Sequence, residues 1–332
     1  MKSTIRFAME EDIPFIMKFI DEHWKKGHVL ATDMELFNWQ YINYDKVNFV
    51  LGCDANNDIQ GVLGYIPYDE TNEKDIALAL WKAENTSDSF LGIKMLVYLL
   101  QEEEHTTVFC TGINPKTTYT IYQYLGMTVG TMLHWYRLRS QEKYYIAGIV
   151  NDIIPPISQI DKYSLKLYND FTELENDFDY KEYEKMVKRP FKSKTYIKKR
   201  YFEHPVYEYK VYGVINETDK ATAIIVLRIQ GYNEAKTIRF VDCIGESNCI
   251  MHITKDIDRL LQEYNAEYVD MYEVGLSEEM MSSAGWLRVK DSGNIIPNYF
   301  SPYEKCNVDI HYCSSDPGAV LFRGDGDQDR PN

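Results

Sequence analysis

The sequence predicts a mixed α/β protein made of two similar units, and three observations lead to that fold class. The chain has 332 residues, roughly twice the size of a typical domain. Hydrophobic residues make up 45% and aromatic residues 14%, a composition typical of a globular protein with a sizeable core. One order of expected elements (a β-hairpin, a strand, a helix, a strand, a helix and a strand) occurs twice. We therefore expect domains at 1–140 and 191–332, joined by a connecting segment at 141–190.

The first unit begins with a strand and a helix. Residues 3–8 are typical of a short strand, and 9–26 repeat apolar residues at helical spacing behind acidic residues that suit a helix N-terminus. Two β-rich runs around DANND then predict an antiparallel hairpin. The remaining elements are a strand at 75–85, a helix from about 90, a strand at 106–114, a helix at 115–126 and a strand at 130–139. We expect the last strand to complete the unit near residue 140.

The second unit repeats this order after a segment that contains the paired prolines Pro155 and Pro156, which mark a connection. Its expected elements are strands at 206–215, 221–230 and 237–245, a helix at 249–264, a strand at 266–274, a short helix at 277–285 and a strand at 286–290. The polar, turn-rich tail at 321–332 is expected to fold back onto the protein, with Arg323 and Arg330 as anchors.

Net charge and cysteine spacing exclude several classes of function. The formal charge of -15 disfavours nucleic acid and anionic membranes as partners, because both attract basic surfaces. The N-terminus lacks the apolar core of a signal peptide, and about 18 apolar residues never run together, so we expect a cytoplasmic protein. The six cysteines are scattered without a CxxC pair, which favours reduced thiols and no metal site.

The segment TGINPKTTYTIYQYLGM, following this order of elements, resembles the GNAT superfamily of acyl-CoA N-acyltransferases. A late helix of that family carries a pattern similar to N…A…LYxxLGF, and here Asn114, Tyr122, Leu125, Gly126 and Met127 fall in the expected order. The resemblance implies two GNAT-like domains, each a mixed, mostly antiparallel twisted sheet flanked by helices. The second domain is expected to be degenerate, because its counterpart of the phosphate loop, CIGESNCIMHITKDI, has no such pattern.

The acyl-CoA loop of the family, Q/R-x-x-G-x-G/A at a helix N-terminus, is only partly kept in SDSFLGI. Ser87 stands where Gln or Arg is usual, Phe90 replaces the first glycine, and Gly92 keeps its place. Backbone N–H groups and the helix dipole can still hold a pyrophosphate, so binding and an ordinary core helix are both open. The resemblance implies a cofactor site made of Leu80, Trp81, Lys82, Ser87, Ser89, Phe90, Leu91, Gly92, Ile93 and Asn114.

The resemblance also implies catalytic roles. Tyr122 matches the family tyrosine that acts as general acid, and the amides near Leu80 to Lys82 would stabilise the oxyanion. Glu84 is a candidate base, directly or through water, and His28 would be the better base if its pKa were near neutral and it faced the pocket. The structural alternatives are a packed tyrosine for Tyr122 and an exposed strand-end carboxylate for Glu84.

The acceptor pocket is expected near the first helix, in DEHWKKGHVLATDMELFNWQY. His23, Trp24, Trp39 and Gln40 supply flat and polar surfaces of the kind that bind sugars. The alternative is a core tryptophan pair with two solvated histidines.

A basic run at 185–200 contrasts with the acidic chain, since it holds eight basic residues and no acidic one. Lys188 and Arg189 within it are candidates for binding the phosphates of a nucleotide-linked substrate, and a solvated helix face is the alternative. Asp325, Asp327 and Asp329 alternate like the start of a calcium loop, but the closing glutamate does not follow before Asn332, so no metal is expected.

The chain also looks like tandem-GNAT proteins of bacterial surface-polysaccharide synthesis, from WQY through KKRYFEHPVYEYKVYG to GDGDQDRPN. This resemblance implies transfer of an acyl group from acetyl-CoA or a longer acyl-CoA to the amino group of a nucleotide-linked deoxyamino sugar, by direct attack in a ternary complex. A peptide or small-amine acetyltransferase and a noncatalytic GNAT-like binding module are the alternatives. The partner is expected to be a small molecule, with monomer and dimer both open.

Overall fold

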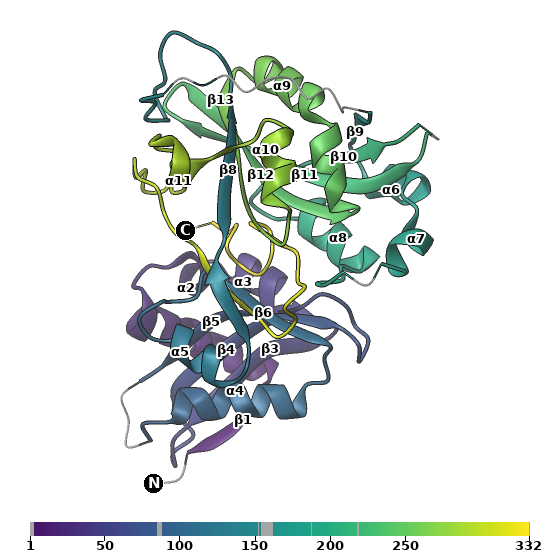
Figure 1. The fold of residues 1–332 in the computed structure, drawn as a ribbon. Coiled ribbons are helices and arrows are strands. Elements are labelled where there is room, and N and C mark those ends of the chain that lie inside the picture. The colour runs from purple at the N-terminus through teal and green to yellow at the C-terminus, as the bar shows by residue number, and fades with distance from the viewer. Residues whose placement is uncertain are drawn as a thin grey trace.

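The computed structural model describes residues 3–84, 88–151, 153, 162–186, 188–217 and 219–331. It confirms the mixed α/β fold class, because two mixed sheets, each flanked by helices, make up the molecule (Figure 1). Residues 154–161, with the paired prolines, lie outside the described part of the chain. Within that part, no helix has both the length and the apolar character needed to cross a membrane.

The first sheet has the strand order β1-β3-β4-β5-β6-β15-β7, with β2 paired to β3. Its strands are β1 (Thr4–Ala8), β2 (Ile42–Asn43), β3 (Lys46–Cys53), β4 (Ile59–Pro67), β5 (Asp75–Ala83), β6 (Thr107–Thr111), β7 (Thr128–Thr131) and β15 (His311–Ser314). Its helices are α1 (Ile13–Phe19), α2 (Val29–Thr32), α3 (Met34–Tyr41), α4 (Leu91–Glu102) and α5 (Tyr119–Tyr124). The expected helix at 9–26 is divided, since short helical turns, Glu10–Asp12 and Ile20–Trp24, flank α1.

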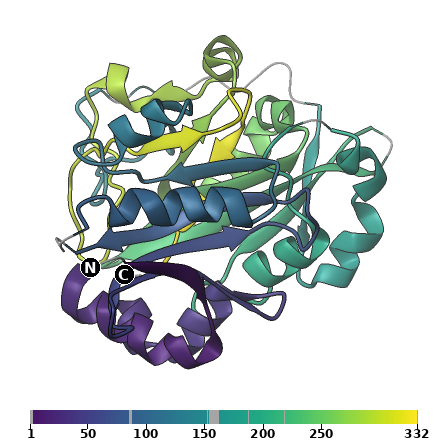
Figure 2. The same ribbon diagram turned by 90° about the horizontal axis from the view of Figure 1, so that it is seen from below.

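Alternation along the strands places the helices on opposite faces of the first sheet. Phe49 and Leu51 of β3 pack with α1, α2 and α3, whereas Val50 packs with α4. Neighbouring residues of a strand point to opposite faces, so the sheet separates two apolar layers. Figure 2 shows the first helices in purple and α4 in blue on either side of the strands.

The second sheet has the order β14-β8-β13-β12-β11-β10-β9, with β16 paired to β13. Its strands are β8 (Leu133–Leu138), β9 (Ser164–Tyr168), β10 (Lys210–Ile215), β11 (Ala221–Tyr232), β12 (Ala235–Gly245), β13 (Ala266–Val274), β14 (Leu287–Arg288) and β16 (Leu321–Phe322). Its helices are α6 (Phe171–Asp177), α7 (Tyr180–Glu184), α8 (Lys194–Tyr201), α9 (Thr254–Glu263), α10 (Glu278–Ser283) and α11 (Val289–Ser292), with a short turn at Ser247–His252. Helices α6 to α8 pack on one face, and α9 and α10 on the other.

The two sheets exchange strands across the expected boundary at residue 140. The expected strand at 130–139 is divided: β7 stays in the first sheet, whereas β8 pairs with β13 and β14 of the second. Strand β15 lies between β6 and β7 instead. Its Cys313 is paired with Cys110 of β6 and with Val129 of β7. The expectation that the 130–139 strand closes the first unit was therefore wrong, because a partner 180 residues away along the chain supplies the missing strand.

The segment 141–190 is more than a connection. Its β9 pairs with β10 at the edge of the second sheet, from Val211 opposite Tyr168 to Ile215 opposite Ser164. Helices α6 and α7 then pack their apolar side chains, such as Leu174 and Tyr183, into the core on one face of this sheet.

The pairing of β5 with β6 covers only part of β5. The parallel pairs run from Asp75 opposite Thr107 to Ala77 opposite Phe109, while β5 continues to Ala83 along β4. From Leu78 onward β5 and β6 separate, and this opening faces the second sheet.

Candidate active site

A cavity of about 760 Å³ lies between the two sheets. The first sheet and α5 contribute Leu80, Trp81, Lys82, Cys110, Asn114 and Tyr122 to its lining. The opposite wall includes Tyr207, Arg228, Gln230, Arg239, Asn298 and Phe300, and the tail adds Arg323 and 327–331. Both halves of the chain and its C-terminal tail therefore build one site.

Among the described residues, none of those in α4 lines this cavity, and the N-terminal end of the helix contacts Trp81, which does. A Cβ on Gly92 would lie 3.3 Å from Trp81 Nε1, so the helix approaches the strand closely here. Phe90, which replaces the first glycine of the motif, is 63% exposed. Asp88 accepts hydrogen bonds from the Phe90 N–H and from Lys94 Nζ, which turns this acidic group into a local cap. The N–H of Leu91 donates to the Asp88 carbonyl at 3.1 Å, and the next N–H groups of the first turn lack helical acceptors.

The other expected cofactor residues divide between core and surface. Leu91, the first residue of α4, is buried, Ile93 is half-buried, and Ser89 is exposed. Asn114 lines the cavity and accepts a hydrogen bond from the Lys116 N–H at 2.9 Å, which shapes the turn before α5. Ser87 lies outside the described residues.

Tyr122 combines burial with access to the cavity. Its side chain is 2% exposed, and its ring lies 5.9 Å from that of Trp81. Burial, with smaller effects of Cys110 and Cys313, raises the pKa of Tyr122 well above its ordinary value. Its hydroxyl therefore stays protonated at neutral pH, as a proton donor must.

Glu84 lies 3.5 Å from His23 Nδ1, and Lys82 Nζ lies 3.1 Å from the same carboxylate. The hydrogen bond from Lys82 is the largest cause that lowers the pKa of Glu84. Neither Glu84 nor His23 belongs to the cavity lining, so the structure brings these two residues together but outside the site.

His28 caps the N-terminus of a helix. It is the N-cap of α2, where its Nδ1 accepts a hydrogen bond from the Leu30 N–H at 3.1 Å. Burial lowers its pKa to about 4, which differs from the near-neutral value expected of a base. His28 also lies outside the cavity lining, because the chain turns its ring inward to cap the helix.

The two tryptophans have separate environments. Trp24 lines the main cavity, with the Arg330 guanidinium 5.1 Å from its ring. Trp39 and Gln40 instead line a small adjacent pocket, and the Trp39 ring lies 4.3 Å from that of His204. The expected acceptor residues therefore lie in two different pockets, with Trp24 in the main cavity and Trp39 and Gln40 in the smaller one.

The basic run at 185–200 has both buried and exposed members: Lys192 and Arg200 are buried, whereas Lys188 is exposed and Arg189 is half-buried. Lys188 Nζ donates to Ser247 Oγ at 2.9 Å, and Arg189 lies 3.3 Å from Asp75 Oδ2. Lys192 is buried between Asp242 at 2.6 Å and Asp325 at 2.9 Å. Lys188 and Arg189 are absent from the lining of the cavity, so these cations join protein segments where the sequence suggested phosphate binding.

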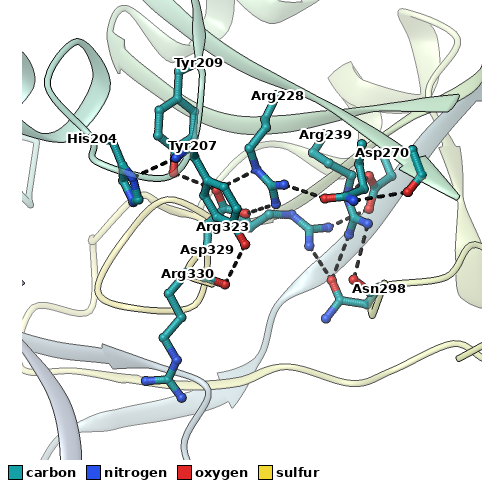
Figure 3. Close-up of polar contacts among 12 residues, drawn as sticks. His204, Tyr207, Tyr209, Arg228, Arg239, Asp270, Asn298, Arg323, Asp329 and Arg330 are labelled. Atoms are coloured by element: carbon teal, nitrogen blue, oxygen red, sulfur yellow. Dashed lines mark hydrogen bonds and ion pairs between the residues drawn. The ribbon is translucent and has the colours of Figure 1, made fainter. Parts of the chain in front are cut away.

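A cluster of polar side chains that sequence reasoning missed forms the wall on the side of the second sheet (Figure 3). Arg228 forms two hydrogen bonds to Asp329, at 2.6 and 3.2 Å, and its guanidinium lies 4.1 Å from the Tyr207 ring. Arg239 and Arg323 both contact Asp270, at 2.8 and 2.6 Å. The sequence signal was weak, because these arginines are isolated within β-strands and a polar tail.

The tail adds a carboxylate to the site. Asp327 lines the cavity and pairs with Arg330. Its charge reaches the buried Tyr41 and Cys110, whose pKa values it helps to raise after the larger effect of burial. Asp327 therefore lies near the opening between β5 and β6. Arg323 anchors the tail as expected, through Asp270 and Asn298.

Comparison with known proteins gives matches among solved structures only. No protein-family model and no curated protein matches the chain. A conserved protein of unknown function from Enterococcus faecalis V583, described as a probable N-acyltransferase, aligns with a TM-score of 0.58 at 9% identity, over 95% of this chain and 72% of its own. A GCN5-related N-acetyltransferase from Anabaena variabilis aligns with a TM-score of 0.56 at 12% identity, over 94% and 72%.

A third structure is a GCN5-related glucosamine N-acetyltransferase region of a fungal multi-domain GH3 β-N-acetylglucosaminidase. It aligns with a TM-score of 0.50 at 10% identity, over 94% of this chain and 38% of its own. At such identities the likeness concerns the fold, and the fold agrees with the motif around Tyr122. The chain therefore has the fold of GCN5-related N-acetyltransferases over nearly its whole length.

Proposed function

We propose that this protein is an acyl-CoA-dependent N-acyltransferase, with the donor at the N-terminus of α4 and the acceptor amine in the 760 Å³ cavity. The observation that carries the proposal is the opening between β5 and β6, where Trp81 and Tyr122 line the cavity and Trp81 also contacts the Gly92 end of α4. The N–H groups of the first turn of α4 suit a pyrophosphate.

The chemistry assigned to this site is direct acyl transfer. The thioester of the donor supplies the reactive carbonyl, and the N–H groups of Leu80 to Lys82 are the proposed stabilisers of its oxyanion. The C–N bond forms as the C–S bond breaks, and Tyr122 gives its hydroxyl proton to the leaving thiolate. The acceptor nitrogen loses a proton in the same reaction, so a base must face the cavity.

Asp327 is the base that we propose. Its carboxylate lines the cavity, whereas Glu84 and His28 do not. It is held by Arg330, whose guanidinium in turn lies near the ring of Trp24, so the carboxylate has a defined orientation. Asp327→Asn should lower turnover by about 10² or more while leaving acyl-CoA affinity unchanged; unchanged turnover would remove Asp327 from this role.

The acceptor that we propose is a nucleotide-linked deoxyamino sugar, acylated in the cytoplasm during surface-polysaccharide synthesis. Trp24, Tyr207 and Phe300 give the cavity aromatic faces, which suit stacking on sugar and base. The structurally similar glucosamine N-acetyltransferase region acts on an amino sugar by its description, which adds support at the level of fold.

Calorimetry on the full chain tests the proposal. Acetyl-CoA and longer acyl-CoAs are titrated first, and each donor that binds is then incubated with a panel of nucleotide-linked amino sugars, with CoA release and product mass as readouts. Micromolar donor binding and a mass increase of one acyl group support the proposal. A folded protein that binds no donor at millimolar concentration would be a noncatalytic binding module, and transfer only to peptides or simple amines would replace the sugar acceptor.

A further inference from the structure

We infer that the cavity wall formed by Arg228, Arg239 and Arg323, here called the arginine wall, binds an anionic group of the acceptor, either a phosphate or a carboxylate. The inference deepens the proposed function and rests on it for the identity of the ligand as the acceptor. It replaces Lys188 and Arg189, which contact Ser247 and Asp75 and do not line the cavity, as the place where the negative charge of a substrate is held.

Arg239 and Arg323 are almost completely buried in the wall of the cavity. They come from β12 and from the residue after β16, they are 1% and 3% exposed, and both line the cavity. A buried charge is costly unless an opposite charge compensates it. We therefore ask whether protein carboxylates compensate both of these positive charges of the arginine wall.

The two guanidiniums share one carboxylate and one amide. Asp270 lies 2.8 Å from Arg239 Nε and 2.6 Å from an Arg323 nitrogen. Asn298 Oδ1 accepts hydrogen bonds from both arginines, and the backbone carbonyls of Pro297 and Asn298 accept from Arg239. Arg323 Nε is buried without a hydrogen-bond partner.

One positive charge remains after these contacts are counted. Asp270 is ionised, since the two arginines lower its pKa to about 2 despite burial. His134 contacts Asp270 at 3.0 Å but stays neutral, because burial lowers its pKa to about 4. Asp329, whose charge also acts on Arg323, is paired with Arg228. Two cations thus face a single anion, and the pKa of Arg323 is lowered by burial and by the charge of Arg239.

The N–H groups of the two guanidiniums indicate which anionic ligand would compensate the remaining positive charge. A guanidinium matches the paired oxygens of a carboxylate or phosphate, and the arginine wall faces the same cavity as Tyr122 and Asp327. In a chain of net charge -15, a locally positive cavity attracts an anion that the rest of the surface repels. The pyrophosphate of a nucleotide-linked sugar and the carboxylate of an amino acid are the two possible sources.

The first experiment titrates the wild-type protein with inorganic pyrophosphate at constant ionic strength, by calorimetry and by thermal unfolding. It is done with and without saturating CoA, so that binding at the end of α4 is separated from binding at the arginine wall. We expect saturable binding and a raised melting temperature that persist when CoA is bound. Absence of pyrophosphate binding in the folded wild-type protein would overturn the inference.

The second experiment uses Arg323→Gln, with Arg259→Gln on the exposed face of α9 as matched control. Removing Arg323 leaves Arg239 paired with Asp270, so the variant should fold with a melting temperature close to that of the wild type and bind pyrophosphate about tenfold or more weakly. The control should bind as the wild type does. A variant that binds pyrophosphate normally would assign these arginines to the fold alone. If the variant does not fold, Arg228→Gln, at the more accessible end of the wall, takes its place.

UDP and succinate then distinguish the two sources. Tighter binding of UDP favours a nucleotide-linked acceptor, and tighter binding of succinate favours an acceptor with a carboxylate; either keeps the inference. Acyl-CoA affinity is measured on the same samples. Normal acyl-CoA binding without anion binding would refute the arginine wall and leave the acyltransferase proposal intact, whereas the reverse result would refute the acyltransferase and keep the anion site.

Discussion

Tyr122 is a core residue that also lines the cavity. Its ring packs against Trp81 within the apolar layer of α4, while the side chain also lines the site. The residue is therefore positioned by packing, and the loss of its oxygen atom alone should leave that packing in place. This separation of structural and chemical roles makes it a clear test of the proposed mechanism.

Tyr122→Phe should lower turnover by about 10² or more and leave acyl-CoA affinity unchanged, because only the proton donor is removed. Steady-state kinetics and calorimetry on the same sample check both. Tyr124→Phe is the matched control, since Tyr124 lies on the same helix and is 90% exposed. Equal turnover in both variants would exclude Tyr122 as the acid.

Glu273 is a buried carboxylate with a pH-dependent effect on stability. It accepts hydrogen bonds from Trp135 Nε1 at 2.8 Å and from the Leu276 N–H at 3.0 Å. Burial raises its pKa to about 7 from 4.5, against the lowering effect of these bonds. Between these two values the folded state binds more protons than the unfolded state, so the contribution of Glu273 to stability falls as pH rises through this range.

Glu273→Gln removes this titration, so the difference in unfolding free energy between wild type and variant should shift by about 3 kcal/mol in favour of the variant between pH 4.5 and pH 7.5. Urea unfolding at several pH values measures it. Glu263→Gln, on the exposed face of α9, should show no comparable trend. A constant difference for Glu273→Gln would mean that this carboxylate has an ordinary pKa.

At the scale of elements, the proposed donor site depends on the N-terminus of α4, which keeps only one glycine of the motif, Gly92. Its N-terminal N–H groups depend on the backbone alone, and its first turn is positioned by the burial of Leu91. Gly92 is the position where space matters, because a Cβ there would already lie 3.3 Å from Trp81 Nε1.

Gly92→Val should weaken acetyl-CoA binding by about tenfold or more, since its methyl groups would press on Trp81 and on the approach of the phosphates. Calorimetry measures the affinity. Gly318→Val, at an exposed position whose Cβ would meet only Asp316 Oδ1 at 3.4 Å, is the control. Wild-type affinity in Gly92→Val would place the donor elsewhere.

The segment around α8 binds the tail through buried charge. Lys192 holds Asp242 and Asp325 together, and Tyr68 of the first unit donates to Asp325 at 3.0 Å. The basic run thus joins three parts of the chain, which its composition alone did not indicate.

Lys192→Met should destabilise the fold by about 3–5 kcal/mol, because two buried carboxylates lose their cation. Burial and the nearby Asp242 raise the pKa of Asp325, so part of the loss should be recovered in mild acid, where Asp325 takes up a proton. Urea unfolding checks both expectations. Lys188→Met, which loses a bond to Ser247 only, should cost much less, and equal losses would contradict the buried network.

At the scale of the whole molecule, the exchange of β8 and β15 makes the two units depend on each other. β15 provides the only pairing between β6 and β7 among the described residues, and β8 lies within the second sheet, between β14 and β13. Cutting the chain at the apparent boundary therefore leaves each sheet with a gap.

Residues 1–140 produced alone should lack a cooperative unfolding transition, since β6 and β7 would be separated and the β8 segment would have no sheet to join. Circular dichroism during thermal unfolding measures this against the full chain. Co-production of 1–140 with 141–332 should restore a cooperative transition. A fragment that unfolds as cooperatively as the full chain would show that the exchange adds little stability.

The sequence alone determined which segments of this protein form helices and strands and in what order they follow one another. Alternating and helical apolar spacing predicted most strands and helices, and the motif around Tyr122 predicted the fold. These are local properties, since period and turn chemistry act over a few residues. The tertiary structure alone decided which edge each strand joins, that Arg239 and Arg323 share Asp270, that Asp327 lines the cavity, and that Lys192 of the basic run lies between two buried carboxylates. Such contacts join residues far apart in the chain, and they depend on which edges and carboxylates remain available once the sheets have formed.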